Sequence, residues 1–471
     1  MKPFAPAAAM RVHAVGVVVI SFLALGGNAR AQFNAAAFLA STYDDNSWAF
    51  HDKRADVYHQ LFAAFSYDIG GDYVFLQPFW YSGAALFRTY DTRSYHQHTA
   101  GIYIQWQVDF HTADTDEEAE DNGEEIGGEE MEEESDEEER LHDGERAGGM
   151  PHRASPWDGG ETGSCVPAST STGEAFSDSL VTYLIVKPVV AARFDEPVFA
   201  FYDFRRASVS AMLRKHVSGP LMARAEYEFA FKQYPSFVQF THLENDGSLT
   251  LSARVGQATE LFCFTEYGVK RYTETVHDTV FIETGNSGKG KGGVKPKKKI
   301  VSEFSTPSAS QVVFGGGAVL NIAASNSLTL SVLRRINPSN TARYVDQRGL
   351  AAATEDDFFE DRYGYEADEA VATFRAGIMP RLAMETELAA ARRRYPRSAA
   401  SLDGDDLPGF PQRKDERFTA QVLLATPVLM RADGTALLTA GAGYHFTRNA
   451  SNDAYHDYNI HRVWVEVEIG L

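Results

Sequence analysis

The chain ends with Arg462-Val-Trp-Val-Glu-Val-Glu-Ile-Gly-Leu471, in which two kinds of side chain alternate. Every odd position from Val463 to Leu471 is apolar, whereas the even positions are mostly polar: Arg462, Trp464, Glu466, Glu468 and Gly470. Because successive side chains of a strand point to opposite faces, this stretch predicts a β-strand with one apolar face and one polar face.

The same alternation recurs upstream, in residues 99–110, 223–232 and 248–255, and most of these runs last about ten residues. Strands of soluble sandwiches are mostly about five or six residues long, whereas a tilted strand that crosses a bilayer needs roughly 9–11. The length of the runs therefore favours a membrane barrel.

The first residues predict export. Lys2 and Arg11 supply positive charge, an apolar run extends from Val15 to Leu25, and Ala29-Arg30-Ala31 has the pattern of a cleavage site. We therefore interpret residues 1–31 as a secretory signal peptide. No later stretch approaches the ~18 consecutive apolar residues of a transmembrane helix, so an exported chain is either soluble or a closed barrel.

The connections between the runs alternate between tight and long. The tight ones are hairpin turns at residues 70–72, 218–220, 257–258, 325–326, 380–381 and 432–434. The long ones include Thr275 to Ser308, Asn337 to Glu366 and Arg397 to Lys414. Outer-membrane barrels have short turns at the periplasmic rim and long loops at the extracellular rim, so we expect both chain ends to face the periplasm.

The alternation predicts an all-β fold, a transmembrane up-and-down antiparallel barrel of about sixteen strands. The expected strands are 33–43, 57–69, 73–90, 96–110, 180–194, 204–216, 221–234, 247–256, 259–273, 309–322, 326–336, 368–379, 381–395, 415–429, 434–448 and 457–471. Asp178 to Phe204 is hard to divide, so twelve or fourteen strands stay open. The barrel thus comprises residues 32–110 and 179–471 around an insert, 111–178.

Composition agrees with a barrel, because the formal charge of -21 is largely local. Asp114 to Glu139 contains seventeen acidic residues and no base. Such a block repels itself, so we expect the insert to be disordered. The strand order places it on the periplasmic side, unless a strand before it has been missed, in which case it is extracellular.

A lysine cluster lies in the longest predicted extracellular loop: Lys289, Lys291, Lys295, Lys297, Lys298 and Lys299. It is either a patch for anionic surface ligands or a solvated loop, and we expect no specific nucleic-acid partner. The other expected partners are outer-membrane lipid and the barrel assembly machinery. We expect no disulfide between Cys165 and Cys263, and we interpret His96 and His98 as part of a polar lumen face rather than a metal site.

A repeat marks the polar face of three strands. It consists of Glu228, Lys232 and Tyr234, then Glu266, Lys270 and Tyr272, then Glu387, Arg393 and Tyr395, while Arg88 and Tyr90 keep only its last half. We predict that these residues line the lumen, together with Arg224, Glu226, Arg254, Glu466 and Glu468.

Stacked acidic and basic rings either select solutes by charge and size or pair across strands and help to plug the lumen. A sixteen-stranded barrel is wide enough for an aqueous channel. No Ser/His/Asp set, paired-carboxylate site or cofactor fingerprint has convincing spacing, so we expect neither an enzyme nor a cofactor. We predict a porin-like passive channel for small hydrophilic solutes; the alternative is a plugged barrel that acts as an adhesin or in surface lipoprotein display or export.

Short motifs at both ends resemble a broad group of diderm outer-membrane barrels. Tyr43-Asp44-Asp45-Asn46 resembles the Y-D-D-N that opens many of them. Arg448 to Asn452 followed by Tyr458-Asn459 is similar to the closing hairpin of barrels related to the surface lipoprotein assembly modulators, and the basic-x-Tyr-Pro strand ends at 232–235 and 393–396 also fit. The chain departs from that group in lacking a helical repeat domain before the barrel and in ending with Leu471 where an aromatic residue is usual. The resemblance implies a barrel in the outer membrane.

We expect a chain that lacks Asp114 to Glu139 to fold as a barrel. Shortening a connection between two strands that end at the same rim changes the closure free energy by only about 0.6 kcal/mol per halving of its length. Refolding and heat-modifiable migration on a gel measure the outcome. A deletion variant that does not refold would show that the acidic block is needed for folding or assembly.

Overall fold

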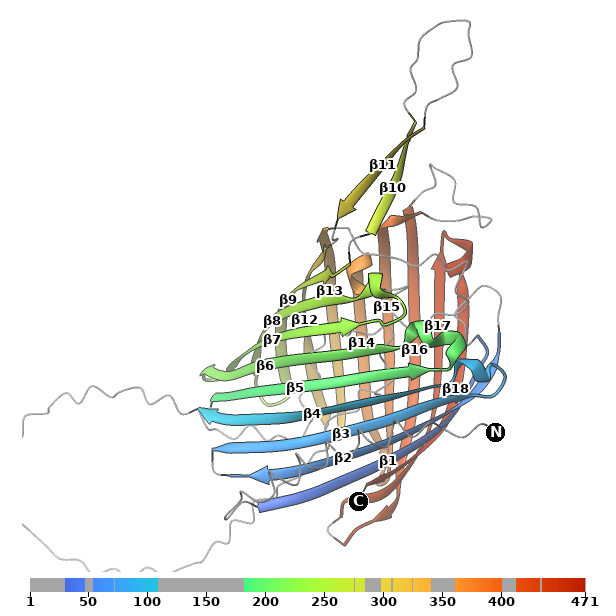
Figure 1. The fold of residues 1–471 in the computed structure, drawn as a ribbon. Helices are drawn as coiled ribbons and strands as arrows, with labels where there is room; N and C mark the ends of the chain where they lie inside the picture. Colours follow the sequence, from blue (N-terminus) through green and yellow to red (C-terminus); the bar gives the residue numbers. More distant parts are fainter. Residues whose placement is uncertain are drawn as a thin grey trace, which may run out of the picture.

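The computed structural model describes residues 30–46, 54–71, 73–108, 182–274, 276–283, 298–305, 308–323, 325–339, 361–399, 412–432 and 434–470. Within them, sixteen strands form one closed antiparallel barrel (Figure 1). These strands are β1 (Arg30–Asp44), β2 (Asp56–Gly70), β3 (Val74–Phe87), β4 (Tyr95–Val108), β5 (Thr182–Asp195), β6 (Phe204–Ser218), β7 (Leu221–Gln233), β8 (His242–Val255), β9 (Thr259–Tyr272), β12 (Ser308–Ala323), β13 (Asn326–Ser339), β14 (Glu366–Met379), β15 (Leu382–Ala399), β16 (Gln412–Met430), β17 (Ala436–Ser451) and β18 (Tyr458–Gly470). The predicted up-and-down barrel of sixteen strands is confirmed.

The outer wall of the barrel is apolar. On β18 the side chains of Val463, Val465 and Val467 are 51%, 59% and 39% exposed, whereas Glu466 between them is 8% exposed. Large apolar side chains are exposed in the same way on other strands, among them Leu39, Leu61, Val209, Tyr227, Leu249, Leu261, Leu330 and Leu388. A continuous apolar belt around a closed barrel is the surface that contacts lipid, so the barrel is a transmembrane one.

No helix in the described ranges is long and apolar enough to cross a membrane.

The Tyr43-Asp44-Asp45-Asn46 motif joins the first strand to the last. Asp44 is buried and accepts hydrogen bonds from the Asn46 amide, at 2.9 Å, and from Arg462 Nε, at 2.7 Å. Asp45 accepts from the His461 amide at 2.7 Å. These carboxylates bind donors just where the β1–β18 ladder ends, so the motif fastens the seam that closes the barrel.

The two rims differ as predicted. We call the rim with the tight turns the short-turn rim; there Gly219 (φ 46°) and Gly256 (φ 69°) adopt left-handed backbone conformations that favour glycine. We call the opposite rim the long-loop rim. Because β4 ends and β5 begins at the short-turn rim, the segment between them joins two strands at that rim. The predicted disordered insert itself lies outside the described residues, as does the predicted signal peptide apart from its last two positions.

Some predicted boundaries were wrong. β8 begins at His242 rather than at residue 247. The prediction started the strand too late because Glu244-Asn-Asp-Gly247 has the composition of a turn. In the structure this stretch pairs with both β7 and β9. The expected long loop 275–308 contains β10 (Val276–Glu283) and β11 (Lys298–Ser305), which form a separate two-stranded sheet beyond the long-loop rim (Figure 1).

His96 and His98 lie on the outer wall, not on the lumen face. Their rings stack on Phe194 and Trp80, whose side chains are exposed on that wall, at centroid distances of 5.2 and 6.1 Å. Both histidines have the same strand parity as Ile102 and Ile104, so the alternation places them among apolar side chains. Cys263 is exposed, and Cys165 lies outside the described residues.

The substitution Val465→Arg should destabilise the barrel by about 2–4 kcal/mol, because it places a guanidinium in the lipid-facing belt near the middle of β18. The measurement is urea unfolding in lipid vesicles. The matched control is Thr373→Arg on the inner face of β14, opposite Glu387. Equal losses in both variants would contradict the assignment of outer and inner faces.

Candidate functional site

A short segment lies against the inner wall of the barrel. It consists of Asp361 and the 3-10 turn Arg362–Gly364, immediately before β14, and we call it the inward segment. Asp361 Oδ1 accepts a hydrogen bond from the Tyr363 amide at 3.1 Å, which fixes the turn. All of its side-chain partners described below occupy inner-face positions of β8, β9, β12 and β13.

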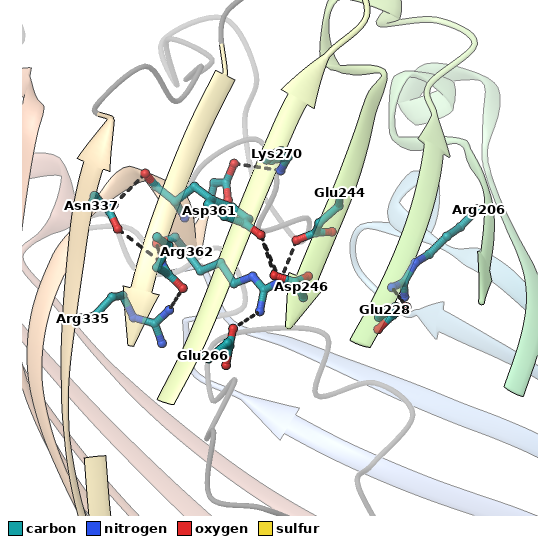
Figure 2. A network of polar contacts seen from close by, with 12 residues as sticks. Arg206, Glu228, Glu244, Asp246, Glu266, Lys270, Arg335, Asn337, Asp361 and Arg362 are labelled. Carbon is teal, nitrogen blue, oxygen red and sulfur yellow. Dashed lines mark hydrogen bonds and ion pairs between the residues drawn. The ribbon is translucent and has the colours of Figure 1, made fainter. Parts of the chain in front are cut away.

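Arg362 is surrounded by three carboxylates (Figure 2). Its Nη2 lies 2.7 Å from Glu244 Oε1 and 2.6 Å from Asp246 Oδ2, and its Nη1 lies 3.1 Å from Glu266 Oε1. Burial opposes its charge, but the carboxylates, Glu244 first, raise the pKa of Arg362 well above its usual value. The guanidinium is therefore held as a cation on an acidic wall, with three acids around one base.

The neighbouring ion pair is fully buried. Lys270 Nζ lies 2.8 Å from Asp361 Oδ2, and the two side chains are 1% and 2% exposed. Tyr272 Oη donates to the same carboxylate oxygen at 3.4 Å. A buried charge without its partner is strongly unfavourable, so this pair anchors the inward segment to β9.

Tyr363 fits against the wall because residue 268 is glycine. Its hydroxyl donates to Asp246 Oδ1 at 2.8 Å, and burial raises the pKa of Tyr363, so the hydroxyl keeps the proton that it donates. Gly268 lies in register between Asp246 and Gln311. A Cβ at that position would clash with the Asp246 carboxylate and lie 2.5 Å from the Tyr363 hydroxyl.

The wall also binds the backbone of the inward segment. Gln311 Nε2 donates to the Arg362 carbonyl, and Asn337 Nδ2 donates to the Tyr363 carbonyl at 2.6 Å. Arg335 Nη1 in turn donates to Gln311 Oε1 at 2.5 Å. Side chains from β8, β9, β12 and β13 thus hold both the charged groups and the main chain of the segment.

The bases and tyrosines of the three-fold repeat lie on the inner wall near the long-loop rim, and its acids lie deeper. Tyr234 and Tyr395 are fully buried, Lys232 Nζ lies 4.2 Å from the Phe204 ring centroid, and Arg393 Cζ lies 4.7 Å from that of Tyr365. Arg413 Cζ lies 4.0 Å from the Tyr395 ring centroid. The bases therefore stack on aromatic rings, which stabilises a cation away from bulk water.

The acidic members of the repeat differ in their surroundings. Glu228 pairs with Arg206 at 2.5 Å, and Glu266 pairs with Arg362. Glu387 is half-buried, and its cross-strand neighbours in the register are Thr373 and Gln421.

The remaining lumen candidates also occupy inner-face positions. Arg224 and Glu226 form a pair at 2.7 Å, and Glu466 accepts from Trp464 Nε1 at 3.1 Å. Arg254 is exposed near the short-turn rim, and Glu468 is half-buried.

Arg88 and Tyr90 do not continue an inner face, because β3 ends at Phe87. The amides of Thr89 and Tyr90 donate to the Asp56 carboxylate, at 2.9 and 3.1 Å, in place of a strand ladder. The inner aromatic position here belongs to Phe87, over which Arg93 Cζ lies at 4.6 Å.

Two of the six lysines of the predicted patch belong to a described strand. Lys289, Lys291, Lys295 and Lys297 lie outside the described residues. Lys298 and Lys299 are the first two residues of β11, where they pair with Glu283 and Ile282 in the backbone register.

Sequence reasoning missed the residues that build the site: Glu244, Asp246, Asp361, Arg362 and Tyr363. The two acids belong to the part of β8 that lay outside the expected strands 221–234 and 247–256, and the other three were assigned to a long loop. A usable signal was the glycine within Glu266-x-Gly268-x-Lys270, since a glycine on the polar face of a strand often marks the close approach of another chain segment.

Comparisons with known proteins identify no family for this chain. No protein-family model matches the chain, and no curated protein matches it significantly. Similar solved structures include in-vitro folded OmpT, an outer membrane protein of Vibrio cholerae (9% identity, TM-score 0.35, covering 95% of this chain and 99% of that one). They also include the outer membrane protein OprD from Pseudomonas aeruginosa (9%, 0.40, 94% and 94%) and OccAB1 of Acinetobacter baumannii (8%, 0.42, 94% and 97%). The resemblance to lipoprotein assembly modulators stays a prediction.

The substitution Lys270→Met should cost about 3–5 kcal/mol of unfolding free energy, because it leaves the buried carboxylate of Asp361 without its cation. Lys232→Met, at the equivalent position of the repeat, is the matched control. Lys232 is half-buried and stacks on Phe204, so the loss there should be about 0.5–2 kcal/mol. Urea unfolding measures both, and losses of equal size would contradict the anchoring role of the Lys270–Asp361 pair.

Proposed function

We propose that this protein is an integral outer-membrane channel for the passive passage of small hydrophilic solutes, narrowed by the inward segment. The observation that carries the proposal is the exposure of charged pairs inside the barrel. The side chains of Arg206 and Glu228 are 39% and 33% exposed, and those of Arg375 and Glu385 are 30% and 42% exposed. Charges are costly to bury without water or full pairing, so exposed pairs on an inner wall indicate a hydrated lumen.

The barrel dimensions agree with this proposal. A closed barrel of sixteen strands encloses more space than its inward side chains fill, and barrels of about this size contain aqueous channels. The inward segment reaches the wall at Glu266, six residues from the end of β9, which is about 20 Å along the strand. It therefore lies within the lumen, where it faces a passing solute.

For orientation, we propose that the long-loop rim is extracellular and the short-turn rim periplasmic. β1 begins and β18 ends at the short-turn rim, which would place both chain ends in the periplasm. The lysine-rich part of the β10–β11 segment would then face the medium, where it is available to anionic surface ligands.

The inward segment would also set charge selectivity, because Arg362 is the cation held among Glu244, Asp246 and Glu266. A unit charge a few ångströms away in a hydrated site is worth about 1 kcal/mol, a factor of roughly five. The substitution Arg362→Ala should therefore raise the permeability of K⁺ relative to Cl⁻ by about fivefold and increase the conductance.

The measurement is single-channel recording of the refolded protein in planar bilayers. Arg362→Lys keeps the charge and should keep the selectivity of the unmodified protein. If neither the protein nor Arg362→Ala conducts ions, the channel proposal fails. Loop-dependent binding to host molecules or lipoproteins would then support the plugged barrel instead.

A further inference from the structure

The lipid-facing wall carries an apolar groove that is separate from the lumen. It has a volume of about 580 Å³ and crosses β12 to β16. The small residues Gly316, Ala318, Ala370, Ala372 and Ala390 lie between the larger Leu330, Val332, Leu388 and Phe418. Gly316, Val332, Ala370, Ala390 and Phe418 form one cross-strand row, and Ala318, Leu330, Ala372 and Leu388 form the next.

The groove opens toward the membrane rather than the lumen. Val332 is 62% exposed, and Leu330, Leu388 and Phe418 are 42%, 45% and 43% exposed, all on the outer parity of their strands. An apolar hollow in a bilayer loses dispersion contacts unless another apolar group enters it. A lipid chain is the apolar group that surrounds this face.

Charged side chains lie directly above the groove, on its long-loop side. The first row contains the pairs Arg334–Asp368, at 2.5 Å, and Arg392–Glu416, at 3.3 Å. The second row contains Glu366, Arg394 and Lys414 in register. Rows are two residues apart, so the second row lies about 7 Å beyond the first.

The second row has an excess of positive charge. Arg394 and Lys414 are directly opposite each other on β15 and β16, and both are exposed. Like charges in this arrangement repel each other, and an anion between them would relieve the repulsion. Across both rows the four bases exceed the three acids by one.

We propose that this face binds one anionic phospholipid, with an acyl chain in the groove and the phosphate between Arg394 and Lys414. The groove volume falls within the range of about 300–1,000 Å³ found for small-molecule sites. A second copy of the chain fits less well, because a self-complementary contact would bring the same surplus of positive charge together. The proposal is independent of ion conduction and needs only that the barrel spans a membrane.

Native mass spectrometry of the refolded full chain in detergent tests the proposal, with phosphatidylglycerol and phosphatidylcholine of identical acyl chains as probes. The unmodified protein should retain one phosphatidylglycerol about tenfold more than phosphatidylcholine, as expected for a charge-assisted contact. The double substitution Arg394→Gln and Lys414→Gln should remove this preference. Ala390→Trp, which fills the groove, should reduce retention of both lipids.

The matched control is Ala225→Trp, on the exposed outer face of β7 and away from the groove, which should retain lipid like the unmodified protein. Heat-modifiable migration verifies folding of each variant, and Ala370→Leu replaces Ala390→Trp if the tryptophan prevents folding. Equal retention of both lipids by the unmodified protein would overturn the proposal. A dimer that is lost on filling the groove would assign the face to a second copy and overturn it as well.

Discussion

Closure of the hydrogen-bond ladder is the constraint on which the rest of this structure depends. Lipid offers no partner to a backbone amide or carbonyl, so a sheet that crosses a membrane has to pair its first strand with its last. Here β1 pairs with β18, and Asp44 and Asp45 bind donors of the last strand at the end of that seam. Once the sheet is closed and its apolar positions contact lipid, strand alternation places the polar positions inside.

The inner wall then has to accommodate the charges that alternation places there. Some of these charges are buried with a partner: Lys270 pairs with Asp361, and Arg393 stacks on Tyr365. The pairs Arg206–Glu228 and Arg375–Glu385 instead keep substantial exposure. The interior thus has two kinds of charged group, those that packing fixes and those that water solvates, and the charged groups of Asp361 and Lys270 belong to the first kind.

The fold was predictable because both of its determinants are periodic. A two-residue alternation sustained along strands of 13 or more residues identifies a lipid-facing wall, and tight turns alternating with long loops order the strands. The repeat on the polar face was predictable in position for the same reason. Its role was predicted only in part, because the aromatic partners of Lys232 and Arg393, Phe204 and Tyr365, come from elsewhere in the chain.

The inward segment was not predictable, since its contacts join residues far apart in sequence without a periodic signal. Arg362 lies about a hundred residues from Glu266 in the chain, and the Glu244-Asn-Asp-Gly247 stretch that supplies its other carboxylates has the composition of a turn. Only tertiary contact distinguishes that stretch from a loop. Gly268 is the one local hint, because its missing side chain leaves space for the Tyr363 hydroxyl.

The central claim, a hydrated lumen behind a lipid-facing wall, is tested most directly by cysteine accessibility in vesicles. With Cys165 and Cys263 replaced by serine, a single cysteine is placed either at Glu228, on the inner face, or at Phe229, which is 41% exposed on the outer face. A membrane-impermeant hydrophilic maleimide should label the cysteine at position 228 rapidly and leave the one at position 229 unlabelled. Protection of the cysteine at position 228 to the same degree as the one at position 229 would contradict the account and indicate a plugged barrel.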